Sequence, residues 1–419
     1  MADRRLRGLS RRLIVDVTPL RRSPDYRLLY LGTVTAHLGR QITVVAVPFQ
    51  VYDLTGSTLA VGLLGVAQFV PLILGSLVGG AVADAVDRRR LLAISQVGLA
   101  LTAMGLAWNS WSEDPRLWPL YVLSGLNAAI SAVDSPTRSA VLPGLVGREL
   151  LASALALNQI LGNVAKAVGP AAAGFLIARF DLAVSYVAEA GLFAVSGLLL
   201  TRLPQLLPEG GGTRFGLESI AEGLAFVRAR SVLQASFLID INAMVFGMPQ
   251  ALFPAVGTEI LGGDVATVGL LYAAPGAGAL LAALTAGWVG AVRHQGRAVI
   301  ASVIVWGGSI GAFGLVGSLP LALALLAVAG GADVISAVFR NTILQMAVPD
   351  SLRGRLSSIH LAVVAGGPRL GDVESGLVAA VTSVRFSITS GGVACILGAL
   401  AVMRFMPSLR NYTSDAVTP

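Results

Sequence analysis

The stretch Val61-Gly62-Leu63-Leu64 recurs as Val268-Gly269-Leu270-Leu271, and this repeat decides the fold. The offset between the copies is 207 residues, close to half of the 419-residue chain. Ser131-Ala132-Val133 recurs as Ser336-Ala337-Val338 at the nearly equal offset of 205. Matches at nearly one offset indicate two copies of one unit. Tandem halves with a site at their interface are typical of secondary transporters.

The composition indicates an integral membrane protein. Apolar residues make up 55% of the chain and charged residues only 13%, whereas soluble domains carry about 25% charged residues. The mean hydropathy is +0.77, and the 49 glycines suit helices that pack closely in a membrane. The single cysteine, Cys395, excludes a disulfide framework and a cysteine metal cluster.

The apolar stretches predict an all-α membrane protein with twelve transmembrane helices in two pseudo-symmetric six-helix halves. A spanning helix needs about 20 mostly apolar residues. We expect spans near residues 28–51, 60–83, 91–111, 117–137, 152–178, 182–202, 232–255, 266–290, 298–318, 321–346, 356–380 and 388–406. The halves are then 28–203 and 232–406, between a basic N-terminus (1–27), a linker (204–231) and a tail (407–419).

The basic residues predict the orientation. Twenty-three arginines fall on the side of the termini and three on the other side, namely Arg116, Arg179 and Arg385. By the positive-inside rule both termini are expected in the cytoplasm, with the net charge of +7 facing the membrane surface rather than a nucleic acid. The linker begins with prolines and Gly210-Gly211-Gly212, and Ser219 to Arg228 has the apolar spacing of a short amphipathic helix.

The connection after the second expected span reads Gly80-Ala81-Val82-Ala83-Asp84-Ala85-Val86-Asp87-Arg88-Arg89-Arg90. This stretch resembles the cytoplasmic signature of the major facilitator superfamily. The resemblance implies a conformational latch made by Gly80, Asp84, Arg88 and Arg89, in which Asp84 approaches the N-terminus of the eleventh span. Ala85 and Asp87 depart from the family pattern, where a basic residue and a glycine are usual. The alternative is a solvated loop that sets the topology.

Further stretches resemble exporters of the same superfamily. Gly169-Pro170 is similar to the glycine-proline signature of proton-driven exporters, although an ordinary small-residue packing face is equally compatible. Ala46-Val47-Pro48, Leu142 to Glu149, Leu271 to Pro275 and Gly371-Asp372 resemble the bacterial enterobactin-exporter branch. The resemblance implies a monomer in the bacterial inner membrane that exports a catecholate siderophore, or a related molecule, in exchange for protons. Drug exporters also belong to this branch.

Ionisable residues inside the expected spans are the candidate site residues, because a charge at the bilayer centre costs about 2.5–3.5 kcal/mol. They are Arg40, Asp134, Lys166, Glu189, Asp240, Asp333, Arg340, Arg369, Asp372 and Glu374.

Four acids are candidates for proton coupling. Asp240 leads, because its own span contains no basic residue and burial favours the neutral form of a carboxylate. Glu189, Glu374 and Asp372 follow.

Structural ion pairs are the alternative for these acids. Asp240 could pair with Arg40 or Arg369, and Glu189 could pair with Lys166. Arg369 and Asp372 are three residues apart on one helix face and can neutralise each other. We expect Asp134 and Arg138 to form a local pair.

The candidate substrate contacts centre on two arginines. Arg40 and Arg369 would attract an anionic group, since a guanidinium recognises carboxylates and similar anions. Candidates beside them are His37, Gln41, Asn242 and Phe246.

The sequence also argues against several other chemistries. No histidine pair has metal-ligand spacing, no Gly-x4-Gly-Lys motif supports ATP as the energy source, and no Ser–His constellation supports catalysis. We therefore expect a transporter rather than an enzyme, without cofactor or metal, that interacts with a small-molecule substrate, protons and the lipid bilayer. The alternatives are a broad multidrug/proton antiporter and a non-transporting membrane sensor.

Overall fold

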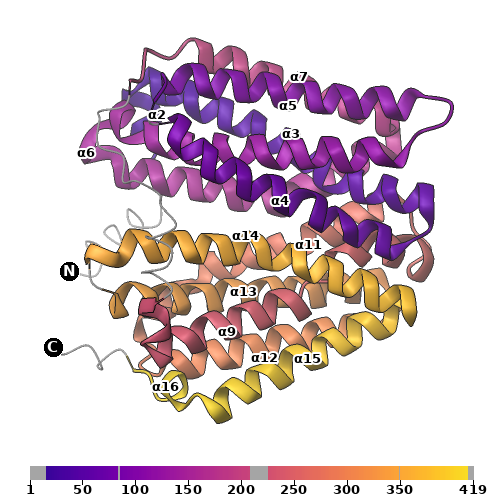
Figure 1. The fold of residues 1–419 in the computed structure, drawn as a ribbon, viewed down its shortest axis with the longest axis vertical. Coiled ribbons are helices and arrows are strands. Elements are labelled where there is room, and N and C mark those ends of the chain that lie inside the picture. The colour runs from indigo at the N-terminus through magenta and orange to yellow at the C-terminus, as the bar shows by residue number, and fades with distance from the viewer. Residues whose placement is uncertain (1–15, 84, 208–224, 349, 414–419) are drawn as a thin grey trace, which may run out of the picture.

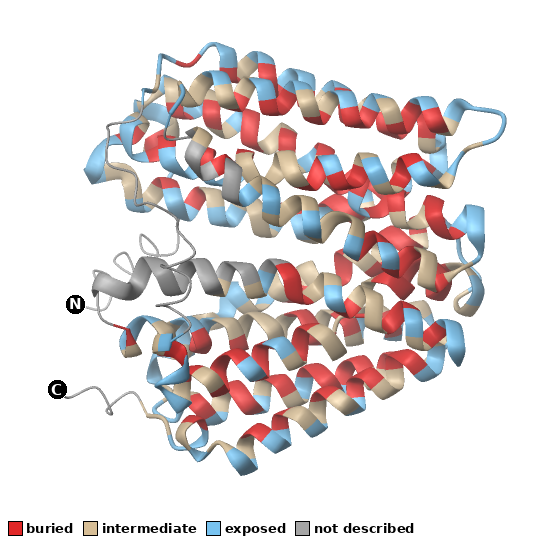
Figure 2. Ribbon diagram, viewed as in Figure 1, coloured by how far each residue is buried: buried red, intermediate tan, exposed pale blue. Residues whose placement is uncertain are grey.

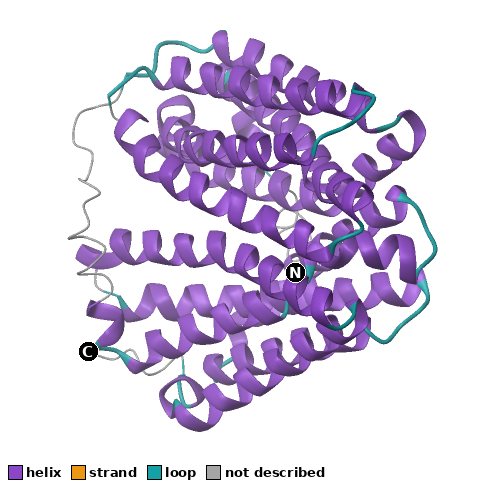
Figure 3. Ribbon diagram, turned by 45° about the vertical axis from the view of Figure 1, so that its right-hand side comes forward, coloured by secondary structure: helices purple, strands orange, loops and turns teal. Residues whose placement is uncertain are grey.

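The computed structural model describes residues 16–83, 85–207, 225–348 and 350–413, which form helices joined by short connections and contain no strand (Figures 1 and 3). The helices are α2 (Thr18–Arg22), α3 (Pro24–Thr55), α4 (Thr58–Ala83), α5 (Arg88–Trp111), α6 (Leu117–Phe180), α7 (Leu182–Thr201), α9 (Ser231–Phe246), η1 (Gln250–Leu252), α10 (Phe253–Ala255), η2 (Val256–Ile260), α11 (Val265–Thr285), η3 (Ala286–Ala291), α12 (Gln295–Phe313), α13 (Leu319–Ala347), α14 (Asp350–Val381), α15 (Val384–Phe405) and α16 (Pro407–Arg410).

Short polar side chains begin several of these helices. The Ser23 hydroxyl accepts a hydrogen bond from the backbone N–H of Tyr26 at 3.1 Å at the start of α3. The Asp264 carboxylate accepts from the backbone N–H groups of Ala266 and Thr267 at 3.0 and 3.3 Å at the start of α11. Such caps satisfy N–H groups that have no partner within the helix.

The twelve expected spans are consistent with the described helices, nine of which are long and apolar enough to cross a membrane. One of the nine, α6, has 64 residues and would be about 96 Å long as a straight helix, three times the hydrocarbon thickness of about 30 Å. It breaks at Gly147, whose φ of 72° and ψ of 170° are accessible essentially only to glycine. α6 therefore contains two expected spans, and α3 and α14 contain the two remaining ones.

Two connections differ from the sequence-based expectation. The connection between the expected spans 117–137 and 152–178, which contains Leu142 to Glu149, is helical except at Gly147. Of the amphipathic helix expected from Ser219 to Arg228, residues 225–228 are helical, and the rest lies outside the described residues.

The expected span at 232–255 is a broken helix. α9 ends at Phe246, and η1, α10 and η2 continue the span as far as Ile260. Side chains from neighbouring helices satisfy carbonyls at the break: the Trp306 indole donates to Gly247 O at 2.8 Å, and the Tyr272 hydroxyl donates to Gln250 O at 3.0 Å. Irregular backbone at membrane depth is tolerated where protein groups satisfy it in this way.

The helices form two bundles. α3 to α7 make one, here called the first half, and α9 to α15 make the second half (Figure 1). α2 and α16 lie at the same end of the molecule, on the left in Figure 1. We call this end the α2–α16 side and the opposite end the far side.

The two halves share a hydrophobic core at the far side. One buried cluster combines Val51, Tyr52 and Ile177 of the first half with Ala255 and Val268 of the second. These residues lie near the far ends of their helices, where Figure 2 shows buried segments meeting between the bundles.

The buried clusters nearer the α2–α16 side belong to single halves. One contains Tyr26, Leu92 and Leu203 of the first half, and another contains Leu233 and Val348 of the second. Among the residues whose side-chain burial the structure describes, the hydrophobic core shared by the halves therefore lies at the far side.

The repeated glycines lie at the contacts between the halves. A Cβ atom on Gly62 would lie 2.5 Å from the carbonyl oxygen of Asp372 in α14, and one on Gly269 would lie 2.6 Å from that of Pro170 in α6. The repeat thus places equivalent glycines at two equivalent interfaces, α4 with α14 and α11 with α6. Small residues let these backbones touch.

Candidate functional site

Asp240 of α9 forms a buried ion pair with Arg340 of α13. The distance between Asp240 Oδ1 and Arg340 Nη2 is 2.8 Å, and the two side chains are 1% and 3% exposed. The contact is not aligned as a hydrogen bond, and neither oxygen of Asp240 has a hydrogen-bond donor among the described residues. The alternative in which Asp240 pairs with Arg40 or Arg369 is wrong, because the partner, Arg340, is supplied by its own half.

Arg340 also approaches two other groups of α13. Its Nη1 donates to the Ser336 hydroxyl at 3.0 Å, and its Nη2 lies 3.9 Å from Asp333 Oδ1. The Asp333 side chain is 35% exposed, although the guanidinium beside it is buried. One arginine therefore faces two carboxylates, one enclosed and one accessible.

The expected pair of Asp134 and Arg138 in the first half is confirmed. Arg138 Nε donates to Asp134 Oδ2 at 2.7 Å, and the side chains are 10% and 2% exposed. Gln96 Nε2 donates to the other oxygen of Asp134 at 2.8 Å, and Arg138 also donates to Thr33 and Ser196. These hydrogen bonds are typical of a structural ion pair, although Asp134 also interacts electrostatically with Arg40 and His37.

Glu189 does not pair with Lys166, so that expectation is wrong. The Thr43 hydroxyl donates to Glu189 Oε1 at 2.5 Å, while Glu189 Oε2 is buried without a hydrogen-bond partner among the described residues. Arg40 interacts electrostatically with Glu189, and its Nε is likewise buried without a hydrogen-bond partner in that part of the chain. Arg40 of α3 and Glu189 of α7 thus each keep a buried polar atom without a hydrogen-bond partner among the described residues.

Lys166 is exposed and faces charges of both halves. It interacts electrostatically with His37 of the first half and with Asp333 of the second. The carbonyl of Lys166 also lies at the close approach of α6 to Gly276 in α11. Lys166 is therefore a charged group at the interface of the halves.

The candidates of α14 meet the break in the seventh span. Asp372 Oδ1 accepts a hydrogen bond from the backbone N–H of Ala251 at 3.0 Å, and Arg369 interacts electrostatically with Asp372. Glu374 is half-buried. Asp372 thus holds the irregular segment η1 against α14.

The remaining substrate candidates have different surroundings. The Asn242 amide donates to Cys395 O at 2.9 Å, which links α9 to α15. Phe246 packs against the core of the second half. Gln41 is buried and packs against Gly169, so the Gly169-Pro170 segment is a close contact between α6 and α3. His37 is half-buried, one turn from Arg40.

The candidate latch is described only in part. Asp84 lies outside the described residues, and Gly80 lies in α4. Arg89 Nη1 donates to Leu203 O at 3.2 Å, and Arg88 Nη1 donates to Ala140 O at 3.4 Å.

Asp87, which departs from the family pattern, caps α5. Its Oδ1 accepts from the backbone N–H groups of Arg89 and Leu206 at 3.0 and 3.1 Å. This carboxylate ties the connection to the segment after α7 within the first half.

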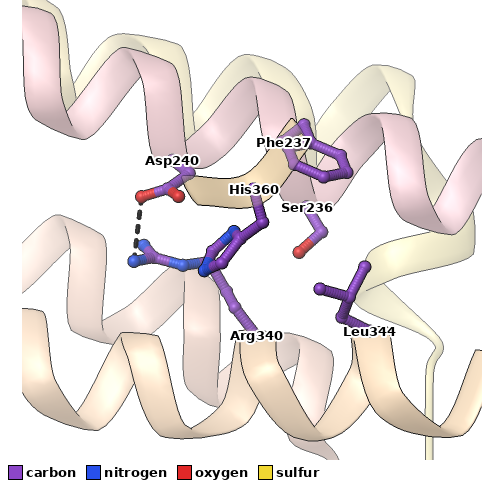
Figure 4. Close-up of a pocket in the computed structure, with 6 residues that line it drawn as sticks. All are labelled: Ser236, Phe237, Asp240, Arg340, Leu344 and His360. Carbon is purple, nitrogen blue, oxygen red and sulfur yellow. Dashed lines mark ion pairs between the residues drawn. The ribbon is translucent and has the colours of Figure 1, made fainter. Parts of the chain in front are cut away.

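Sequence reasoning missed two groups that the structure brings to the site. His360 and Ser236 lie beside the Asp240–Arg340 pair and line a small cavity with it (Figure 4). Tyr52 donates a hydrogen bond to Glu259 across the halves. His360 and Tyr52 meet their partners from different helices, so spacing along the sequence did not point to them.

Two repeated helical bundles with buried charges inside each define a secondary transporter of the major facilitator type. The model of the transmembrane secretion effector family matches residues 15–419, and the chain belongs to this family of the major facilitator superfamily. It is a multi-pass membrane protein.

Named relatives agree with this assignment. The chain is 26% identical over 407 residues to the enterobactin exporter of Citrobacter koseri, covering 97% of both chains, and 27% identical over 401 residues to the enterobactin exporter of Escherichia coli strain K12, covering 95% of this chain and 96% of the relative. A crystal structure of a POT family transporter in complex with 5-aminolevulinic acid has the same fold, with a TM-score of 0.75 and 12% identity over 92% of this chain and 97% of the other.

Proposed function

We propose that this protein exports a small anionic or catecholate molecule from the bacterial cytoplasm in exchange for protons. The observation that carries the proposal is the buried pair of Asp240 and Arg340. The enterobactin exporters that match nearly the whole chain support the direction of transport and the substrate class.

Asp240 can exchange its partner Arg340 for a proton. As a carboxylate, Asp240 pairs with Arg340 at 2.8 Å. When Asp240 is protonated the attraction is lost and Arg340 is released toward Asp333, which lies 3.9 Å away. Because a buried charge without its partner is costly, the proton changes which arrangement of α9 and α13 is stable.

The shared core at the far side supports alternating access. The arginine distribution supports a cytoplasmic α2–α16 side and a far side that faces outward. Among the residues whose side-chain burial the structure describes, the buried apolar cluster shared by the halves lies there, which supports a state open to the cytoplasm. Rocking of the halves about the site would open the far side instead.

Arg40 and Glu189 support an anionic or catecholate substrate. Arg40 Nε and Glu189 Oε2 are buried without hydrogen-bond partners among the described residues. An unsatisfied buried polar group costs about 1–3 kcal/mol, so such groups usually bind a ligand or an ordered water. A catecholate offers an acceptor for the guanidinium and, when protonated, a hydroxyl donor for the carboxylate.

The test uses inside-out vesicles with an acidic interior and enterobactin as the probe. We expect uptake that a protonophore abolishes and that Asp240→Asn reduces to background with unchanged amounts of folded protein. Asp181→Asn is the matched control, because Asp181 is an exposed cap of α7 away from the site. Normal proton-driven uptake by Asp240→Asn would exclude Asp240 as the coupling group.

The accessible carboxylate of Asp333 favours a second candidate, a multidrug/proton antiporter that takes up cations. This reading predicts that a lipophilic cationic dye is transported, that enterobactin is not, and that Arg40→Gln has no effect on dye transport. The same vesicles decide between the two substrates.

A further inference from the structure

The buried pair borders a small cavity. A cavity of about 10 Å³ is lined by Ser236, Phe237, Asp240, Arg340, Leu344 and His360 (Figure 4). This volume is close to that required for a single water molecule. The lining residues come from α9, α13 and α14, so the cavity is internal to the second half.

Polar atoms without partners surround this cavity. Both oxygens of Asp240 and the Nε of Arg340 are buried without a hydrogen-bond partner among the described residues. A buried water usually makes two to four hydrogen bonds to such groups. The cavity therefore has the size and the polar lining of a one-water site.

His360 lies on the cytoplasmic approach to Asp240. α9 begins at Ser231 on the α2–α16 side, and Ser236 and Phe237 precede Asp240 by about one helical turn. His360 is half-buried, and its ring packs edge-on against Phe237, with 6.1 Å between the centroids. The imidazole thus lies between Asp240 and the α2–α16 side.

We propose that His360 is the relay through which Asp240 releases its proton to the cytoplasm, by way of one water in this cavity. This inference rests on the proposed proton exchange and adds the route and its direction. His360 acts through the water and Asp240 and does not contact the substrate.

The step is a proton transfer in two stages. The O–H bond of protonated Asp240 breaks as its proton passes to the water, and a proton of that water bonds to an imidazole nitrogen of His360. The imidazolium then loses a proton to solvent on the α2–α16 side, which restores the neutral ring. The carboxylate left behind pairs with Arg340, as in the structure.

The charges around His360 disfavour a long-lived imidazolium, which suits a residue that passes a proton on. α9 contributes Asp240, and α13 contributes Arg340 and Asp333. Further along α14 the next ionisable residue is Arg369, nine positions on. Arg340 interacts electrostatically with His360 and opposes a second positive charge there, so a proton on the ring is passed on quickly.

The experiment measures proton flux through His360→Ala in proteoliposomes that carry an enterobactin gradient, with a pH-sensitive dye inside. We expect flux to fall about tenfold or more, in line with the loss of a proton-transfer group, while equilibrium binding of enterobactin stays unchanged. Added imidazole should restore flux in His360→Ala. His294→Ala, which removes an exposed histidine elsewhere, should leave flux unchanged.

His360→Gln is a second variant that keeps hydrogen bonding and polarity but cannot carry a proton. It should be as slow as His360→Ala. Wild-type flux in either variant overturns the relay, and so does a loss in folded His360→Ala that imidazole does not restore. If the wild-type protein transports enterobactin without moving protons, the proposed exchange itself fails, which is a separate outcome.

Discussion

Tyr52 of α3 donates a hydrogen bond to Glu259 of η2, and these two residues are 207 positions apart. This separation equals the offset between Gly62 and Gly269 in the repeat. A residue can contact its own repeat equivalent only near the pseudo-two-fold axis that relates the halves. The bond between Tyr52 and Glu259 therefore marks this axis at the far side, where the halves share their core.

Removing this bond should favour opening of the far side. Tyr52→Phe keeps the buried ring and removes only the hydroxyl. The contact between the halves then loses about 0.5–1.5 kcal/mol of stabilisation, the net contribution of one hydrogen bond. We expect the population open at the far side to rise about twofold to tenfold. Fluorescence energy transfer between labels on the two halves at the α2–α16 side measures the change.

Tyr121→Phe is the matched control for Tyr52→Phe. The Tyr121 hydroxyl donates to Ala60 O at 2.7 Å within the first half. Its loss should leave the distribution between the two states unchanged. Equal shifts in both variants would show that the bond to Glu259 does not hold the halves together.

Gly62→Ala should disturb the contact of α4 with α14. The added Cβ would lie 2.5 Å from the carbonyl oxygen of Asp372, and backbone on both sides leaves little room to adjust. Such overpacking costs about 1–3 kcal/mol. Thermal unfolding in detergent should show a lower midpoint than for wild type. Gly191→Ala, where nothing lies within 4 Å, should be neutral or slightly stabilising.

Arg138→Met should destabilise the first half strongly. It leaves Asp134, which is 2% exposed, as a buried charge without its arginine. Breaking such a pair costs about 3–5 kcal/mol, whereas replacing both partners by apolar residues often costs much less. Denaturant unfolding should therefore find the double variant Asp134→Leu/Arg138→Met more stable than Arg138→Met. The reverse order would show that Asp134 does not depend on Arg138 for its stability in the fold.

Arg40→Gln should weaken the interaction with an anionic substrate. A hydrogen bond to a charged group contributes about 1.5–3 kcal/mol, so the enterobactin concentration for half-maximal transport should rise about tenfold or more. Arg179→Gln is the control, because Arg179 is exposed at the far end of α6 and stacks on Phe180. Unchanged transport in Arg40→Gln would remove Arg40 from the substrate site.

The membrane class and the positions of the spans could be predicted because they follow from local hydropathy. The break after α9 could not, although Gly247 and Pro249 were visible in the sequence. Both residues also occur inside continuous membrane helices. What makes the break stable is the indole of Trp306 and the carboxylate of Asp372, which come from other helices.

The ion pairs show the same division. Asp134 and Arg138 are four residues apart on one helix, so their pairing could be predicted from helical geometry. The partner of Asp240 is 100 positions away in α13, and the expected pair of Glu189 and Lys166 does not form. Helical spacing carries no information about which neighbouring helix presents a charge.

The sequence by itself determined that the chain is a two-fold repeat of apolar helices with charges inside them, because repetition and hydropathy are properties of the chain. Only the tertiary structure decided which charges meet, where His360 lies and at which side the halves share a hydrophobic core. These depend on how rigid helices pack against each other, and that packing is decided by contacts between residues far apart in the sequence, such as Gly62 with Asp372.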